Sequence, residues 1–91
     1  MGSSGPALVT VRYWAAARAA AGRESDQVAA ATLAEALREV KALHRDDRRF
    51  ADVVGVCSVL VGSAPVSSQD ADAVPLAEGD VVELLPPFAG G

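Results

Sequence analysis

Apolar and polar side chains alternate along residues 8–14 of the chain. The apolar set is Val9, Val11 and Tyr13, which alternate with Thr10, Arg12 and Trp14. A period of two is that of a half-buried strand, so we expect a β-strand here. An alanine-rich run at 15–21 and a turn at Gly22-Arg23 follow. A short return strand at 27–28 would complete a hairpin with a long connection, although the alanine run could equally form a helical turn.

The segment 32–44 has the pattern of an amphipathic helix. Thr32 and Glu35 have the spacing of a capping box, in which each side chain binds the other's backbone N–H. The apolar residues that share one helical face are Leu33, Ala36, Leu37, Val40 and Leu43. We expect the helix to end near His44. The segment 45–49 mixes both signs of charge and is predicted to be a solvated loop.

The second half of the chain predicts further strands. Val56–Val61 is rich in β-branched residues, which favours a central strand. A turn at 62–65 leads to a short partner strand that begins at Val66, and 67–73 is expected to be a surface loop. After a short extended piece at 74–76 and a turn at 78–80, Val81–Leu85 should form a strong last strand. Pro86 and Pro87 then end the pairing, because neither has an N–H to donate.

One main helix and four or five strands must share a single core, which favours a mixed sheet with the helix packed across one face. The fold class is therefore α+β. The order ββαβ(β)β, with a strong and central last strand, is that of the β-grasp, or ubiquitin, fold. We expect one domain at 7–85 and a flexible Gly-Gly tail at 86–91, and we interpret residues 1–6 as a cloning remnant.

Composition narrows the possible functions. The chain has 91 residues and a net charge of −4, which argues against a nucleic-acid-binding or basic membrane-surface module. A single Cys and a single His exclude metal sites built from several of these residues. No apolar run is long enough to span a membrane, and no secretory signal is visible, so a cytoplasmic location is expected. Nineteen Ala, thirteen Val and no Ile point to a GC-rich bacterial genome.

The chain ends in Pro86-Pro87-Phe88-Ala89-Gly90-Gly91. Packing in a hydrophobic core gives no reason for this sequence, so we ask which function it could serve. A carboxylate is a poor electrophile until a better leaving group is attached, for example by adenylation with ATP. Two glycines without Cβ atoms allow the backbone to enter the narrow channel of another enzyme. The Pro pair holds the emerging chain extended, which reduces the entropy lost on insertion. Phe88 can serve as an apolar anchor on a partner.

These residues resemble a known family. From about Val9 to Gly91, the chain is similar to the small subunit of molybdopterin synthase, the MoaD family, within the MoaD/ThiS group of ubiquitin-like sulfur carriers. The resemblance rests on the segments 11–15, 33–43 and 76–83, on Arg18 and Gly22, and above all on the ending 85–91. The Pro pair favours the molybdopterin branch over the thiazole branch. Phe88 departs from the smaller aliphatic residue that is usual there.

The resemblance implies a carrier that is not catalytic alone and binds no cofactor. A MoeB/ThiF-type activating enzyme would use ATP to adenylate Gly91, and a sulfur donor protein would convert it to a thiocarboxylate. The tail would then enter a MoaE-type large subunit and donate sulfur to a pterin precursor. A carrier for thiazole or cysteine synthesis, a protein modifier joined through Gly91, and a β-grasp adaptor that does not use its tail are the alternatives.

Four further residues carry hypotheses. Arg18 matches a family position and either faces a partner, braces the tail or is simply solvated. If Val9, Val11 and Tyr13 face the helix, Trp14 lies on the opposite sheet face, where a large aromatic often marks an interface. Cys57 is expected to be an inert core residue of an apolar strand. His44 is expected to be a surface residue at a helix C-terminus.

Overall fold

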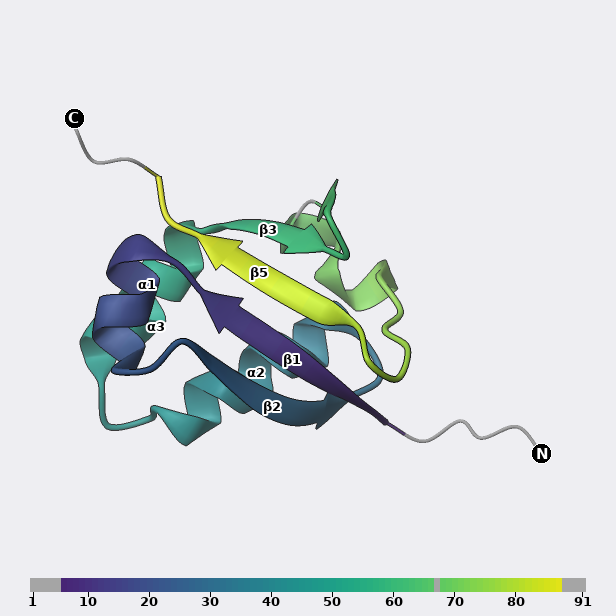
Figure 1. Cartoon of the computed structure of the whole chain (residues 1–91), viewed down its shortest axis with the longest axis horizontal. Coiled ribbons are helices and arrows are strands. Elements are labelled where there is room, and N and C mark those ends of the chain that lie inside the picture. The colour runs from purple at the N-terminus through teal and green to yellow at the C-terminus, as the bar shows by residue number, and fades with distance from the viewer. Residues whose placement is uncertain (1–5, 67, 88–91) are drawn as a thin grey trace.

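The computed structural model describes residues 6–66 and 68–87. Five strands form one mixed sheet in the order β2-β1-β5-β3-β4 (Figure 1). They are β1 (Ala7–Tyr13), β2 (Ser25–Ala30), β3 (Ser58–Val61), β4 (Ala64–Val66) and β5 (Val81–Leu85). β5 runs parallel to β1, and the other neighbouring pairs are antiparallel. The last strand therefore lies at the centre of the sheet, as the sequence predicts, and β3 lies beside it rather than at the centre.

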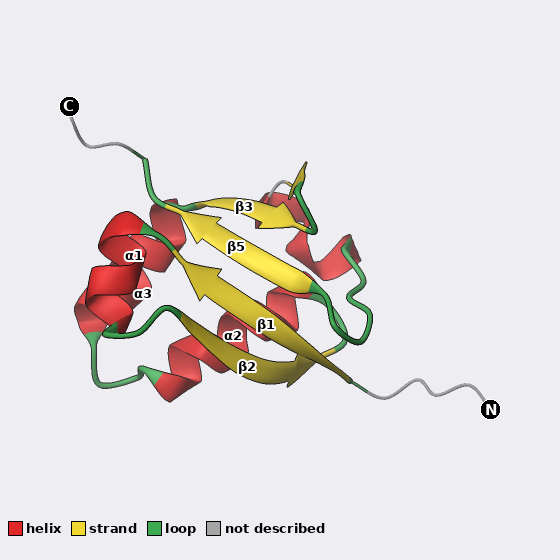
Figure 2. Cartoon of the chain, in the orientation of Figure 1, coloured by secondary structure: helices red, strands yellow, loops and turns green. Residues whose placement is uncertain are grey.

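Three α-helices and one 3-10 helix complete the fold of the described residues. They are α1 (Ala15–Ala21), α2 (Leu33–Leu43), α3 (Arg48–Val56) and η1 (Ser68–Ala73). In Figure 2, α2 passes behind the sheet, and α1 lies at the end where β1 and β5 finish. The alanine run is thus a helix, and it ends at Gly22, whose φ of 74° is a left-handed conformation that glycine adopts without a Cβ clash.

The capping box predicts the start of α2 correctly. The backbone N–H of Glu35 donates to Thr32 Oγ1 at 3.2 Å, and Glu35 Oε1 accepts from the backbone N–H of Ala31 at 2.8 Å. Glu35 therefore reaches back one residue further than the predicted partner, Thr32. The helix ends at Leu43, with His44 as its C-cap.

The prediction for residues 45–57 is wrong in part. Arg48 and Arg49 open a helix instead of ending a loop, and Val56 ends that helix instead of starting a strand. Asp47 is the N-cap of α3, and its Oδ1 accepts from the backbone N–H of Phe50 at 3.1 Å. A second element that differs is the loop expected at 67–73, which contains the 3-10 helix η1.

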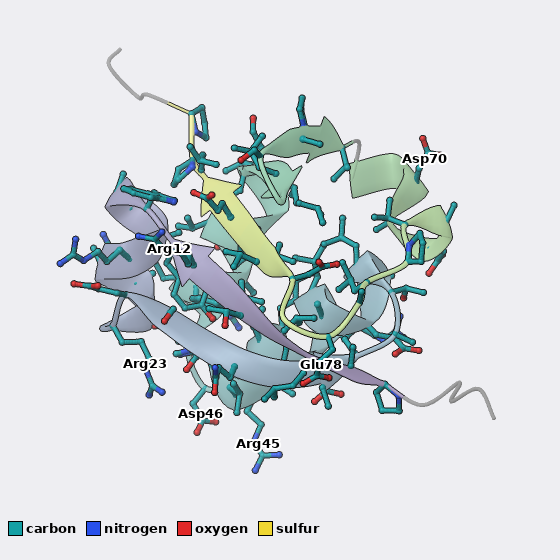
Figure 3. All side chains as sticks on the ribbon, turned by 45° about the vertical axis from the view of Figure 1, so that its right-hand side comes forward. Arg12, Arg23, Arg45, Asp46, Asp70 and Glu78 are labelled. Carbon is teal, nitrogen blue, oxygen red and sulfur yellow. The ribbon has the colours of Figure 1, made fainter. Side chains whose placement is uncertain are left out.

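The core lies between the sheet and the helices. Alternate residues of β1, namely Val9, Val11 and Tyr13, are buried against Leu33, Ala36 and Val40 of α2, together with Phe50 and Val54 of α3. None of the helices in the described part of the chain covers the opposite face of the sheet (Figure 1). That open face bears Arg12 of β1, which is exposed (Figure 3). The two faces of one strand thus have different roles.

Candidate functional site at the root of the C-terminal tail

A pocket of about 570 Å³ lies where β5 ends and the tail begins. Its lining is mostly apolar and consists of Trp14, Ala15, Ser58, Leu60, Leu85, Pro86 and Pro87. Leu60 and Leu85 reach this side of the sheet because their neighbours Val59 and Leu84 point into the core. The pocket therefore belongs to the open face and adjoins the first two residues of the tail.

Trp14 forms one side of this pocket. It follows β1 in an extended conformation and keeps 39% of its surface exposed. Ala15 then has a φ of 49°, which is uncommon for a residue with a Cβ and bends the chain sharply into α1. The prediction that Trp14 lies opposite Val9, Val11 and Tyr13 is confirmed, because those three side chains are buried.

Two polar side chains contact the Trp14 ring. Its Nε1–H donates to Glu83 Oε1 at 2.9 Å, and Arg12 Cζ lies over the ring, 5.0 Å from the centroid. Arg12 and Glu83 are direct neighbours in the register of β1 and β5. Neither residue is singled out by the sequence, since only the parallel pairing of β1 with β5 brings them together.

The pocket brings together three of the residues proposed from the sequence, Trp14, Pro86 and Pro87. Arg18 does not line it. Arg18 lies on α1, and its Nη2 is 3.3 Å from Glu24 Oε2 in an ion pair whose side chains are 57% and 73% exposed. The remaining proposed residues, Phe88, Ala89, Gly90 and Gly91, lie outside the described part of the chain, as do residues 1–5.

A buried polar cluster that sequence reasoning missed lies below the sheet. Asp26 of β2 is only 7% exposed. Its Oδ2 accepts from Tyr13 Oη at 2.7 Å and lies 2.9 Å from His44 Nε2, and its Oδ1 lies 2.8 Å from Arg23 Nη1. His44 in turn stacks on the ring of Phe50, with centroids 4.2 Å apart. The cluster joins β1, β2 and the ends of α2 and α3.

The cluster shifts the pKa values of Asp26 and Tyr13. Burial by itself raises the pKa of Asp26, but the hydrogen bonds from His44 and Tyr13 and the charge of Arg23 outweigh it, so the pKa of Asp26 lies below its ordinary value. Burial, followed by the hydrogen bond to Asp26, raises the pKa of the Tyr13 hydroxyl. Asp26 is therefore held as an anion and Tyr13 as a neutral donor.

The expectation for His44 is wrong, and the expectation that Cys57 is buried is confirmed. His44 is not a surface residue: its side chain is only 9% exposed because it packs between Asp26 and Phe50. Cys57 is buried, as expected, although it caps α3 instead of lying within a strand. Its Sγ donates to the carbonyl of Val53 at 3.2 Å, and burial raises the pKa of the thiol to about 11, so the reactive thiolate is disfavoured.

Within residues 6–66 and 68–87, no three His, Cys, Asp or Glu side chains come together in a group that could hold a metal ion. Among the helices in the same part of the chain, none is long and apolar enough to cross a membrane.

The sequence places the chain in a family of small β-grasp proteins. Residues 11–91 match the ThiS family, and the chain belongs to this family. The match includes the residues that line the open-face pocket and residues 86–91. No functionally curated protein matches the chain in sequence.

Solved structures agree with this assignment. The chain is similar to a putative molybdopterin converting factor subunit 1 from Pyrococcus furiosus, with 26% identity, a TM-score of 0.72 and coverage of 90% of this chain and 99% of the other. It is also similar to one chain in the complex of subunits 1 and 2 of molybdopterin-converting factor from Helicobacter pylori, with 26% identity, a TM-score of 0.62 and coverage of 92% of this chain and 99% of the other. Small archaeal modifier protein 1 from Methanosarcina acetivorans has a TM-score of 0.73 at 19% identity over 94% and 98%, and shows the fold alone. The chain is thus a ubiquitin-like protein of the MoaD/ThiS type.

Proposed function

We propose that this chain is the sulfur-carrier small subunit of a molybdopterin synthase, with the carboxylate of Gly91 as its reactive group. The observation that carries the proposal is the position of the pocket. The central strand β5 ends at Leu85, and Pro86 and Pro87 extend from it along the wall of an apolar pocket. A partner that covers this pocket receives the next four residues of the chain, which end in Gly90-Gly91.

The chemistry proceeds in three steps. A carboxylate oxygen of Gly91 attacks the α-phosphate of ATP on an activating enzyme, and pyrophosphate leaves. The terminal sulfur of a donor persulfide then attacks the acyl carbon and displaces AMP, and a thiol reduces the resulting acyl disulfide to the thiocarboxylate. The thiocarboxylate sulfur finally bonds to a pterin precursor on the large subunit, and water then cleaves the acyl carbon–sulfur bond and returns Gly91 to a carboxylate. The carrier itself contributes docking and reach, and the reacting side chains belong to its partners.

The docking surface has the features of a partner site. Protein interfaces are enriched in aromatic residues at an apolar centre with a polar rim. Trp14, Leu60 and Leu85 supply the apolar centre, and Arg12 and Glu83 lie beside it. The Helicobacter pylori complex contains subunits 1 and 2 of a molybdopterin-converting factor, which supports a large subunit as the partner proposed here.

The decisive experiment is intact-mass measurement after incubation with ATP, a persulfide donor and the activating enzyme. We expect a mass increase that equals the exchange of one oxygen for one sulfur. Deletion of Gly91, or addition of one residue after it, should abolish the change while leaving the circular dichroism spectrum unaltered. Sulfur incorporation in either variant would refute the carrier role of Gly91.

Binding to the large subunit tests the docking surface. Phe88→Ala should cost about 2–4 kcal/mol of binding free energy, as for a buried interface anchor. This loss should be nearly independent of salt, whereas Arg18→Ala should weaken binding in a salt-sensitive way if Arg18 faces the partner. Calorimetric titration at low and high salt measures both. Unchanged binding of Phe88→Ala would show that the tail inserts without an apolar anchor.

The second candidate is a protein modifier, because a modifier would use the same Gly90-Gly91 ending and the same activation. Both functions begin with an adenylated Gly91, so the product distinguishes them. A thiocarboxylate that converts a pterin precursor supports the synthase subunit. An isopeptide bond between Gly91 and a lysine of another protein supports the modifier. A thiocarboxylate consumed only in thiazole or cysteine synthesis would indicate a carrier of a different pathway.

A further inference from the structure

On the open face, two polar side chains lie beside two apolar ones where β1 and β5 end. We call Arg12 and Glu83 the polar row, and Trp14 and Leu85 the apolar row. Arg12 and Glu83 are neighbours in the strand register, and side chains two residues further on point to the same side. Those residues are Trp14 and Leu85, which line the pocket. The apolar row therefore lies between the polar row and the tail.

The polar row contacts Trp14 on two different parts of its ring. Glu83 Oε1 accepts from the indole Nε1–H at 2.9 Å, which fixes the ring edge. The Arg12 guanidinium lies over the ring, 5.0 Å from its centroid, which favours one ring face. In addition, the backbone N–H of Trp14 donates to the carbonyl of Leu84 at 3.2 Å, so the main chain of Trp14 is held by β5 as well.

We propose that Glu83 and Arg12 are positioning residues that hold the Trp14 indole as a fixed side of the pocket before any partner arrives. This inference rests on the proposed function, because the partner is the large subunit that covers the pocket. Neither charged residue needs to touch the transferred sulfur or the tail. Their effect on binding passes through the orientation of one aromatic side chain.

Two physical consequences make this arrangement useful for binding. A side chain that is ordered in the free protein loses less conformational entropy when a partner covers it. The indole N–H is also already paired, so covering the pocket with an apolar surface leaves no unpaired donor. A partner that matches the pocket therefore has an apolar centre, and carries polar groups where it meets the Arg12–Glu83 row.

The first experiment uses the free protein, because Trp14 is the single tryptophan of the chain. Fluorescence anisotropy and near-ultraviolet circular dichroism then report on this ring. Glu83→Ala should lower the anisotropy and weaken the near-ultraviolet tryptophan bands. Glu83→Gln keeps an oxygen that can accept from Nε1 and should retain both signals. Glu39→Ala, which removes an exposed carboxylate from α2 on the other side of the sheet, is the matched control.

The second experiment measures binding of each variant to the large subunit by calorimetry. Glu83→Ala should weaken binding about two- to tenfold, the range expected from ordering one rotamer-rich side chain. Glu83→Gln should restore binding close to that of the parent. In a Trp14→Phe background, which keeps an apolar ring but has no N–H to donate, Glu83→Ala should change binding no further.

Two outcomes overturn the inference. Unchanged anisotropy in Glu83→Ala would show that Glu83 does not hold the ring. An equal loss of binding in the Trp14 and Trp14→Phe backgrounds would show that Glu83 contacts the partner directly. Failure of the parent protein itself to bind the large subunit would refute the proposed function, and the anisotropy of the free protein would still decide whether Glu83 orders Trp14.

Discussion

Tyr13 and Trp14 are consecutive residues, yet each donates a hydrogen bond to a carboxylate on a different side of the sheet. Below the sheet, Tyr13 Oη donates to Asp26, which is 7% exposed, at 2.7 Å. On the open face, Nε1 of Trp14, a residue that is 39% exposed, donates to Glu83 at 2.9 Å. Each pair also has an arginine nearby, Arg23 below and Arg12 above. The chemistry is alike, and the difference is burial.

Burial decides what each pair contributes. Removing one member of a buried hydrogen-bonded pair leaves the other member unpaired. This lowers the free energy of unfolding by several kcal/mol, because water cannot replace the lost hydrogen bond. An exposed pair exchanges with water and contributes little to stability. We therefore assign the Asp26 cluster to the stability of the fold and the Glu83 pair to the shape of the docking surface.

The largest effect should come from Asp26→Ala. This substitution leaves the Tyr13 hydroxyl and the His44 ring nitrogen without their buried acceptor, and we expect a loss of about 3 kcal/mol in the free energy of unfolding. Urea denaturation followed by far-ultraviolet circular dichroism measures it. Asp46→Ala, at an exposed position in the turn after α2, should stay within about 0.5 kcal/mol of the parent. A loss in Asp26→Ala of less than about 1 kcal/mol would contradict the structural role of the cluster.

Tyr13→Phe should have the next largest effect. It removes one hydrogen bond to a charged acceptor and keeps the ring that packs edge-on against Phe50 at 5.4 Å between centroids. We expect a loss of about 1.5 kcal/mol, again from urea denaturation. The equivalent change on the other face, Trp14→Phe, should cost clearly less, because water can replace the lost N–H donor to Glu83 there. Equal costs for the two substitutions would remove the distinction between the two faces.

The dependence of stability on pH should follow Asp26. Its pKa in the folded protein lies below the ordinary value of 3.8, so its contribution to stability is fully present above that value. The contribution is lost as the pH falls from there through the lower folded pKa. Unfolding free energies across this acid range should therefore fall more steeply in the parent than in Asp26→Asn. Parallel curves would show that Asp26 does not titrate differently in the folded and unfolded states.

Sequence patterns predicted the elements whose signals are local. The period of two in β1, the Thr32–Glu35 capping box and the Pro pair after β5 each act within a few residues, and each gave the right element. The helix α3 was missed because its signals conflict. Asp47 and Phe50 have N-cap spacing, and Phe50 and Val54 share a buried face, but Gly55 disfavours a helix and the β-branched valines around it favour a strand.

The residues of the candidate site and of the buried cluster also differ in whether a local sequence signal indicates them. The sequence predicts a role for the tail and for Trp14, since the ending 85–91 and an aromatic on the alternate side of a strand are both local features, and the structure places Trp14, Pro86 and Pro87 around one pocket. Glu83 and Asp26 were not found, because their partners are distant in sequence. Trp14 meets Glu83 only through the parallel pairing of β1 with β5, and Asp26 meets His44 only through the packing of α2 under β2.

The smallest effect on stability should come from Glu83→Ala. The hydrogen bond from Trp14 is open to solvent, so water replaces the carboxylate and the released side chain regains entropy. We expect a change within about 0.5 kcal/mol in the free energy of unfolding, even though the same variant should bind the large subunit less tightly. Far-ultraviolet circular dichroism is the appropriate probe, since the emission of Trp14 responds to the substitution itself. If Glu83→Ala were to destabilise the protein as much as Asp26→Ala, the polar row of the open face would serve the fold, and its assignment to the docking surface would be wrong.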